Sequence, residues 1–214
     1  MKKQLAQKFE EKILQTQVLF DNFPWEQKEA YAELLAQTYY YVRHTMTFIA
    51  TSVAQFNLID RPLHRQLIKH LAEENGHDIM LINDLKALGM KVEDFPERPQ
   101  TSALYQSQYY YFDHENPYAH FGYAYYLEGV SAHSLQAIAD TTTRIYGERA
   151  STFYRLHGEE DVGHFAKGLK LLEGLPPEAL ESIEKNLNET SFFYMGMVEA
   201  ISQKWAKQKG QKAA

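Results

Sequence analysis

The sequence contains no cysteine among its 214 residues. This absence excludes disulfide bonds, cysteine-ligated zinc, iron–sulfur clusters and cysteine nucleophiles. Basic residues are also in the minority, because 22 Lys and Arg face 28 Asp and Glu and leave a net charge of −6. A general nucleic-acid-binding protein usually carries a basic face, so we expect no nucleic-acid partner. The chain has no run of about 18 apolar residues, and we expect no membrane span. Its first residues lack the apolar core of a signal peptide, which predicts a cytoplasmic protein.

Glycine and proline are scarce, with 11 and 7 residues, and they fall mostly between segments of helical periodicity. The segments that we predict to be helical are 3–20, 25–57, 62–88, 101–112, 117–145, 149–173 and 177–206. Apolar residues make up 44% of the chain, enough to bury one core. We therefore expect an all-α, single-domain bundle of about seven helices over residues 1–206, followed by a frayed basic tail over 207–214. A homodimer is the expected oligomeric state, because most soluble oligomers have two-fold symmetry.

Two segments far apart in the chain repeat one pattern, His-x-x-x-acid-x-x-His. The matching residues are His70, Glu74 and His77 in HLAEENGH, and His157, Asp161 and His164 in HGEEDVGH. At about 100° per residue, the three positions of each pattern fall within about 60° of arc, so they share one face of a helix. Imidazole and carboxylate groups therefore recur in the same arrangement on two predicted helices.

The polar patterns interrupt apolar faces. Leu67 and Leu81 flank the first pattern, Phe153 and Leu171 flank the second, and Glu128 lies in a third apolar stripe. A buried carboxylate without a partner costs several kcal/mol, and the central turns of these stripes contain no Lys or Arg. A bound cation would compensate the acids, with imidazole nitrogens and carboxylate oxygens as its ligands.

The candidate ligands are too many for one tetrahedral zinc ion, which takes four. They are Glu74, His77, Glu128, His157, Asp161 and His164, with His70 as a weaker candidate. Mixed imidazole and carboxylate ligands suit iron, manganese or zinc. Helix-bundle di-iron sites use Glu-x-x-His pairs together with further carboxylates that bridge the metals. The pattern therefore favours a site for two metal ions.

Three motifs carry a resemblance to a known family: EENGHDIMLINDLKALG, YYLEG and HGEEDVGH. Over about residues 30–175 the chain resembles the haem-oxygenase-like di-iron oxidases and oxygenases, which share a fold with haem oxygenase and with the TenA and PqqC proteins. The resemblance implies an oxidoreductase with two non-haem iron ions, or manganese, and O2 as co-substrate. It also implies a small-molecule substrate, such as an amino acid, an amine or a fatty acid, and an external electron donor.

The chain departs from the family pattern in its first motif. Many members carry a glutamate at the position of His70, whereas others use the glutamate that corresponds to Glu74. Glu73 is the neighbouring alternative to Glu74 as a ligand. His70 is then either a further metal ligand or a group that supports one.

Other residues are candidates for substrate chemistry. Arg43 and His44 are candidates for holding a substrate carboxylate, and Tyr125, one turn from Glu128, is the candidate redox-active or substrate-facing phenol. His133 lies off the Glu128 stripe and is expected to be structural or at the surface.

Competing functions come from other classes. A ferritin-like iron-handling protein would use Glu33 in addition to the two Glu/Asp-x-x-His pairs and Glu128, but would leave His157 without a role. A cofactor-free oxidase of the PqqC kind would use His, Tyr and Arg, and the acids on the apolar stripes argue against it. A TenA-type thiaminase needs a cysteine, and a haem oxygenase needs only one proximal histidine. A non-catalytic interaction protein would not require buried acids and imidazoles.

Overall fold

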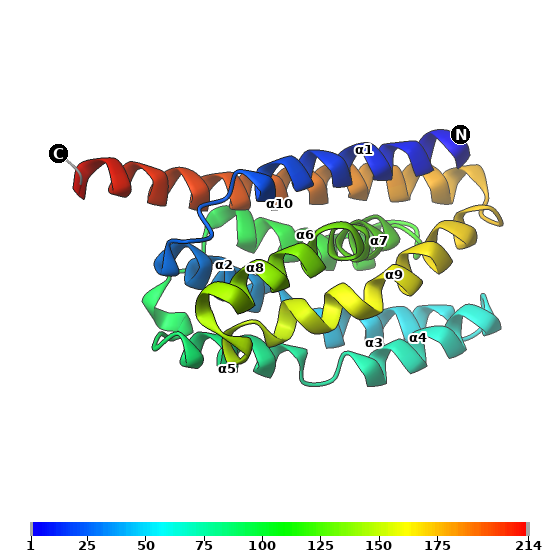
Figure 1. Ribbon diagram of the computed structural model, residues 1–214. Coiled ribbons are helices and arrows are strands. Elements are labelled where there is room, and N and C mark those ends of the chain that lie inside the picture. The colour runs from blue at the N-terminus through cyan, green and yellow to red at the C-terminus, as the bar shows by residue number, and fades with distance from the viewer. Residues whose placement is uncertain (1, 213–214) are drawn as a thin grey trace.

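The computed structural model describes residues 2–212, except for the side chains of 159–164, 166–167 and 208–212. The described chain is helical throughout, with no strand in that range, so the all-α prediction is confirmed. The helices pack as a bundle in which α1 (Lys2–Asp21) and α10 (Pro177–Lys212) lie side by side along one face (Figure 1). An ion pair between Lys8 and Glu184 joins these two helices.

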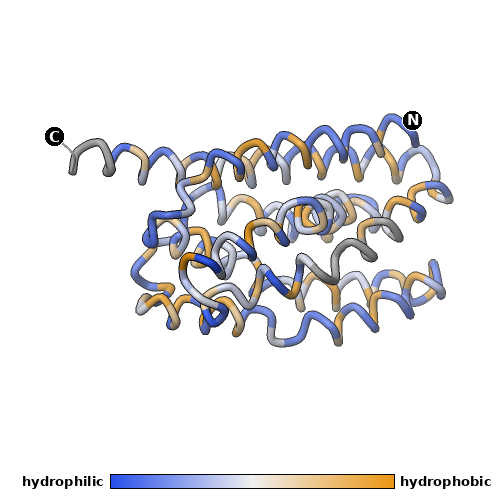
Figure 2. Tube along the Cα trace, in the orientation of Figure 1, coloured by the Kyte–Doolittle hydropathy of each residue, from blue (hydrophilic) through white to orange (hydrophobic). Residues whose placement is uncertain are grey.

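The other helices form the rest of the bundle. They are α2 (Lys28–Val42), α3 (Thr45–Phe56), α4 (Arg61–Glu73), α5 (His77–Ala87), α6 (Pro99–His114), α7 (Phe121–Val130), α8 (Gln136–Tyr146) and α9 (Thr152–Leu172). Short 3₁₀ turns cover Val92–Asp94 and Glu148–Ala150, and a π-helical turn, Ser131–Leu135, joins α7 to α8. Hydrophobic and hydrophilic positions alternate along the helices (Figure 2). Within the described residues, no helix combines the length and the apolar character needed to cross a bilayer.

Three segments that the sequence predicts as continuous helices are interrupted, and those predictions are wrong at the interruptions. The predicted helix 25–57 divides into α2 and α3, where the His44 amide bonds the Tyr41 carbonyl and tightens the turn. The predicted helix 62–88 divides into α4 and α5 at Gly76, whose φ is +94°. The predicted helix 117–145 contains the π-helical turn. One predicted helix is instead too short: α10 continues to Lys212, beyond the end that the sequence predicts at 206.

Tyrosines fill much of the core and also fasten helices to one another. The Tyr31 hydroxyl donates to the Ala150 carbonyl at 2.6 Å, and the Tyr126 hydroxyl lies 2.6 Å from Thr16 Oγ1. Both rings are fully buried. A tyrosine combines a large apolar body with one polar atom that needs a partner when it is buried, which explains part of the high tyrosine content.

Two close contacts fix the position of α9. The buried Asp84 of α5 accepts hydrogen bonds from Thr152 Oγ1 at 2.5 Å and from the Phe153 amide at 3.0 Å, so it caps the start of α9. Gly158 then lets α9 approach the junction of the π-helical turn and α8, because a Cβ there would lie 2.8 Å from the Gln136 nitrogen. The helix that carries His157 is therefore held from both sides.

Candidate metal centre

Glu74, His77 and His157 converge on one point in the bundle. Each offers a ligand atom, and these atoms all lie within 4.8 Å of one another. The rings of His77 and His157 are 4.7 Å apart between centroids and meet edge to face. Glu74 follows the last residue of α4, and His77 is the first residue of α5. The break in the helix at Gly76 thus lets Glu74 and His77, three residues apart, face the same point.

The Glu74 carboxylate is surrounded by imidazoles. Glu74 Oε1 lies 3.3 Å from His70 Nε2, and Oε2 lies 3.0 Å from His77 Nδ1. Burial by itself would raise the pKa of this carboxyl, but the hydrogen bonds with His70 and His77 and the nearby His157 more than offset it and hold the pKa well below its ordinary value. Within the described part of the chain, Glu74 forms ion pairs with histidines and with no Lys or Arg.

His157 is oriented by its own helix. Its Nδ1 lies 2.9 Å from the Phe153 carbonyl oxygen, so Nδ1 carries the proton and donates it. The Phe153 ring packs at 4.0 Å from the imidazole centroid. In the neutral imidazole, Nε2 is then the nitrogen that carries the free lone pair. A hydrogen bond of this kind fixes the tautomer and ring orientation of metal-binding histidines.

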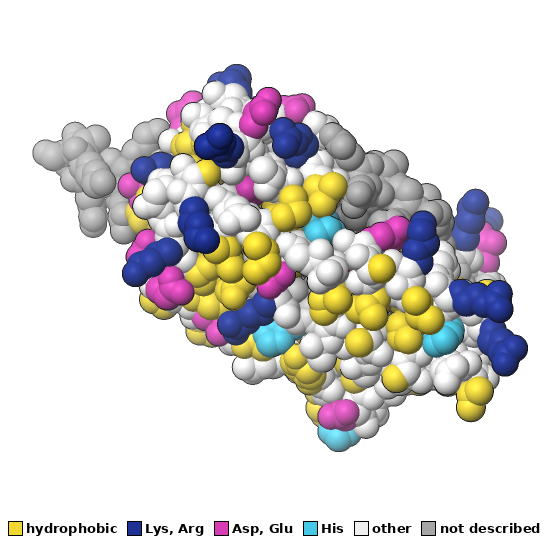
Figure 3. Space-filling view, turned by 90° about the horizontal axis from the view of Figure 1, so that it is seen from below, with side chains coloured by type: hydrophobic (Ala, Val, Ile, Leu, Met, Phe, Trp, Pro, Cys, Tyr) yellow, Lys and Arg dark blue, Asp and Glu magenta, His cyan; other side chains and the backbone are white. Residues whose placement is uncertain are grey.

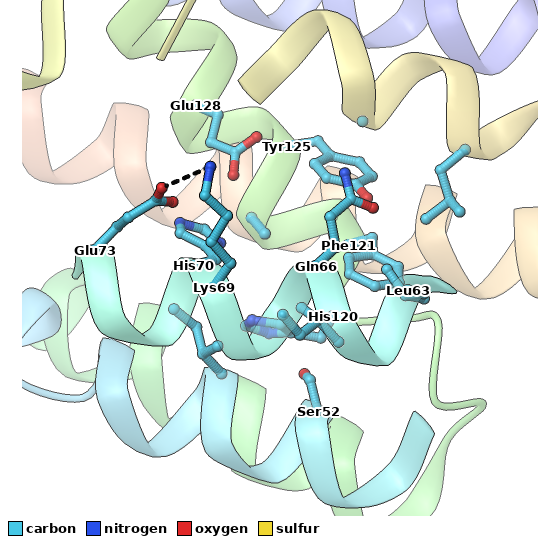
Figure 4. Close-up of a pocket in the computed structure, with 15 residues that line it drawn as sticks. Ser52, Leu63, Gln66, Lys69, His70, Glu73, His120, Phe121, Tyr125 and Glu128 are labelled. Carbon is cyan, nitrogen blue, oxygen red and sulfur yellow. Dashed lines mark ion pairs between the residues drawn. The ribbon is translucent and has the colours of Figure 1, made fainter. Parts of the chain in front are cut away.

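A cavity of two adjoining chambers lies beside this cluster. The inner chamber, of about 100 Å³, is lined by Glu74, His157 and Glu128 among others. The outer chamber, of about 140 Å³, shares the walls formed by Glu128 of α7, His70 of α4 and His120. Figure 4 shows the outer chamber, in which Glu128 faces α4 across the space above His70. Glu128 thus lies in the same cavity as the Glu74 cluster.

Two of the site residues that the sequence predicts, His70 and Tyr125, line the cavity. His70 lines both chambers and contacts Glu74. Tyr125 lines the outer chamber, where it stacks on Phe121 with ring centroids 5.1 Å apart. The α9 backbone approaches the Tyr125 ring so closely that a Cβ at Gly168 would lie 2.5 Å from it. The side chains of Asp161 and His164 lie outside the described residues, so their place as ligands stays a prediction.

Arg43 and His44 do not line either chamber. Arg43 is exposed and lies over the rings of Tyr39 and Tyr40. His44 stacks on Tyr105 at 4.1 Å between centroids, in the interrupted turn between α2 and α3. The interruption directs both side chains away from the cavity, which the prediction of one continuous helix could not show. His133 is exposed, as expected, and its Nδ1 lies 2.8 Å from the Gly129 carbonyl.

Glu33, the additional acid of the ferritin-like alternative, pairs with cations elsewhere in the fold. Arg98 Nη2 lies 2.6 Å from Glu33 Oε1, and Lys204 Nζ lies 2.7 Å from Oε2. The Trp205 indole nitrogen also donates to Oε2 at 2.7 Å. This carboxylate is fully satisfied by the chain and has no need of a metal ion.

Sequence reasoning missed His120, which is buried in the wall between the two chambers. Burial and the neighbouring His70 lower the pKa of His120 to about 3, so its imidazole is neutral at physiological pH. Its Nδ1 lies 3.2 Å from Gln108 Oε1. The signal was present in the sequence, because His120, Ala124 and Glu128 follow one another at helical spacing on one face.

A family model described as iron-containing redox enzyme matches residues 32–190, which is most of the chain. The chain belongs to the iron-containing redox enzymes. The matched region contains the Glu74, His77 and His157 cluster and Glu128. No curated protein matches this redox enzyme in sequence.

Solved structures share the fold of this iron-containing redox enzyme. One is a domain of unknown function with a haem-oxygenase-like fold from Shewanella denitrificans, with a TM-score of 0.79, 20% identity and coverage of 98% of this chain and 96% of that one. A TenA homologue from Pseudomonas syringae has a TM-score of 0.77, 11% identity and 93% coverage of each chain. A CADD-like protein of unknown function from Nostoc punctiforme has a TM-score of 0.72, 16% identity and coverage of 95% and 97%. At these identities the likeness establishes the haem-oxygenase-like fold.

Proposed function

We propose that this iron-containing redox enzyme is an O2-activating non-haem di-iron oxidase or oxygenase that acts on a small molecule. The observation that carries the proposal is the convergence of Glu74, His77 and His157 beside the inner chamber, where among the described residues only imidazoles form ion pairs with the carboxylate. One carboxylate and two imidazoles are a donor set that suits iron. The family match supports the same metal.

In this proposal two metal ions would be held by residues from three helical segments. Glu74 and His77 would bind from the α4–α5 turn, Glu128 from α7, and His157 from α9. Asp161 and His164, later on α9, would complete the set on the strength of their sequence spacing. The carboxylates offer the bridging oxygens that paired metals need. When bound, the iron ions supply the electrons with which O2 is reduced.

The chain's own groups prepare the cavity for this chemistry. Glu74 is ionised at neutral pH, so it offers a charged oxygen without first losing a proton. His157 presents Nε2 because its Nδ1 is bonded to the backbone. His120 is neutral and therefore adds no positive charge beside the cation site. Aromatic side chains line much of the inner chamber beside these groups.

Two features of the structure argue against the alternative functions. The ferritin-like alternative needs Glu33, whose oxygens are engaged by Arg98, Lys204 and Trp205. The cofactor-free alternative needs an arginine in the cavity, and Arg43 is exposed outside both chambers. The ferritin-like alternative also leaves His157 without a role, although this imidazole lies in the cluster with Glu74 and His77.

Anaerobic loading with Fe(II), followed by removal of free metal and determination of iron per chain, tests the proposal. We expect about two irons per chain, as in other helix-bundle di-iron sites, and O2 consumption faster than that of the same amount of free iron. A ferritin-like protein would instead retain hundreds of irons per shell. An iron-free protein after loading, or O2 uptake no faster than that of free iron, would contradict the di-iron oxidase.

A further inference from the structure

Each chamber contains a buried hydroxyl that the proposed metal centre does not use. Tyr123 lines the inner chamber and is 4% exposed, and its hydroxyl has no hydrogen-bond partner in the structure as described. Ser52 lines the outer chamber and is 1% exposed, and its Oγ likewise has no partner there. A buried hydroxyl left unsatisfied costs about 1–3 kcal/mol, so two on one cavity indicate a missing bonding partner.

Neighbouring hydroxyls show how such groups are otherwise satisfied. Thr51, adjacent to Ser52 on α3, donates to the Thr47 carbonyl at 2.8 Å, the usual partner of a helical hydroxyl. Ser52 makes no such bond, and Figure 4 shows its oxygen turned toward α4, which carries Gln66 and His70. The described chain has two further buried hydroxyls without a partner, those of Tyr111 and Ser134, and both lie outside the chambers. It is the position of Tyr123 and Ser52 on the cavity walls that makes their hydroxyls candidates for bonding a ligand.

The lining of the inner chamber selects for an uncharged group. Aromatic side chains that include Phe48, Phe153 and Tyr154 form much of its wall, and its described lining contains no Lys or Arg. An anionic group there would meet the carboxylates of Glu74 and Glu128. In the outer chamber, by contrast, charged side chains are present at the rim, where Lys69 pairs with Glu73 at 3.2 Å.

We propose that the cavity binds an amphipathic small molecule with its uncharged end in the inner chamber. That end is apolar apart from one hydroxyl or carbonyl group, which hydrogen-bonds the Tyr123 hydroxyl beside the metal centre. The polar end of the molecule lies in the outer chamber, where Ser52 and Gln66 offer hydrogen bonds. As an assignment of substrate class, this inference rests on the proposed di-iron function, whereas the binding of an uncharged polar ring in the chamber is testable without it.

Fluorine NMR with three small probes tests the assignment on the full-length, metal-stripped protein. The probes are 4-fluorophenol, fluorobenzene and 4-fluorobenzoate, which share a ring and differ in polarity and charge. We expect 4-fluorophenol to bind most tightly and 4-fluorobenzoate most weakly. Tyr123→Phe should weaken 4-fluorophenol binding by roughly two- to tenfold, the value of one neutral hydrogen bond, and leave fluorobenzene binding unchanged.

Tyr111→Phe is the matched control, because Tyr111 is equally buried but lies in neither chamber. It should leave the affinity for every probe unchanged. The assignment is overturned if 4-fluorobenzoate binds more tightly than 4-fluorophenol, or if Tyr123→Phe and Tyr111→Phe have the same effect. It is also overturned if Tyr123→Phe has no effect, which would mean that water satisfies the hydroxyl.

Loading with Fe(II) under anaerobic conditions then separates this inference from the proposed function. Paramagnetic iron in the centre should broaden the signal of 4-fluorophenol bound in the adjoining chamber. Probe binding that depends on Tyr123 without such broadening would support the chamber and count against the metal centre. Broadening that Tyr123→Phe leaves intact, at unchanged affinity, would support the metal centre and refute the hydrogen bond.

Discussion

Glu33 is a buried carboxylate and Glu74 a largely buried one in the same bundle, yet their surroundings differ in kind. Glu33 accepts hydrogen bonds from Arg98, Lys204 and Trp205, so two cationic side chains of the protein compensate its charge. In the described part of the chain, the hydrogen-bonding partners of the Glu74 carboxylate are the imidazoles of His70 and His77, with His157 nearby. Imidazoles, unlike guanidinium or ammonium groups, can give up their protons and bind a metal ion.

The difference separates a structural acid from a candidate ligand. A buried ion pair such as that of Glu33 is complete within the fold, and breaking it leaves an uncompensated charge. The Glu74 cluster instead places a carboxylate and two imidazoles within 4.8 Å of one another, where a cation could bind to all three. Burial of an acid is therefore a weak indicator of a metal site, whereas the identity of its compensating groups is a strong one.

The sharpest test applies one substitution, Glu→Gln, to both positions. Glu74→Gln keeps the shape of the side chain and removes the charge that balances the metal, so iron affinity should fall by roughly 100-fold or more. The metal-free protein should unfold at a denaturant concentration close to that of the wild type, because a buried charge has been removed. Iron titration and urea unfolding measure the two effects. Wild-type iron affinity in this variant would show that Glu74 is not a ligand.

Glu33→Gln should give the opposite result. It leaves Arg98 and Lys204 without their carboxylate, which should lower the free energy of unfolding by about 3 kcal/mol. Iron content per folded chain should stay at the wild-type value, because Glu33 lies outside the chambers. Loss of iron without loss of stability would reverse the assignment and revive the ferritin-like reading.

The helical class could be predicted from the sequence, and the His-x-x-x-acid-x-x-His patterns could indicate candidate ligands, because helical periodicity and ligand spacing are local properties. The interruptions between α2 and α3, between α4 and α5, and at Ser131–Leu135 could not be predicted, because tertiary contacts select them over the continuous helix. The Glu33 partners escaped prediction for a related reason. Arg98 and Lys204 lie far along the chain from Glu33, and only the fold brings them together. The positions of Arg43 and His44 outside the cavity could not be predicted either, because they depend on the break between α2 and α3.

A smaller effect on the metal centre should follow from Asp84→Ala. Loss of the hydrogen bonds to Thr152 and Phe153 should cost about 2 kcal/mol of stability and loosen α9, which carries His157. Iron affinity should then fall by about tenfold although Asp84 is not a ligand. Thr16→Val, which removes a buried hydrogen bond with Tyr126 away from the cavity, serves as the control. If both variants reduce iron affinity equally, the effect is general loosening and Asp84 has no positioning role.

The smallest effect should come from the turn that joins Glu74 to His77. Gly76 has a φ of +94°, and a Cβ there would meet nothing within 4 Å, so Gly76→Ala introduces backbone strain without a clash. The strain should lower the free energy of unfolding by about 1 kcal/mol and move Glu74 slightly relative to His77.

Gly89, after the other end of α5, is the matched control, since its φ is +74° and it too has open space around a Cβ. Gly89→Ala should cost a similar amount of stability and leave iron affinity unchanged. Gly76→Ala should in addition weaken iron binding by a few-fold, because the backbone at Gly76 sets the distance between two of the three clustered side chains. Equal iron affinity in the two variants would mean that the α4–α5 turn tolerates the shift, and that the imidazole and carboxylate reorient by side-chain rotation alone.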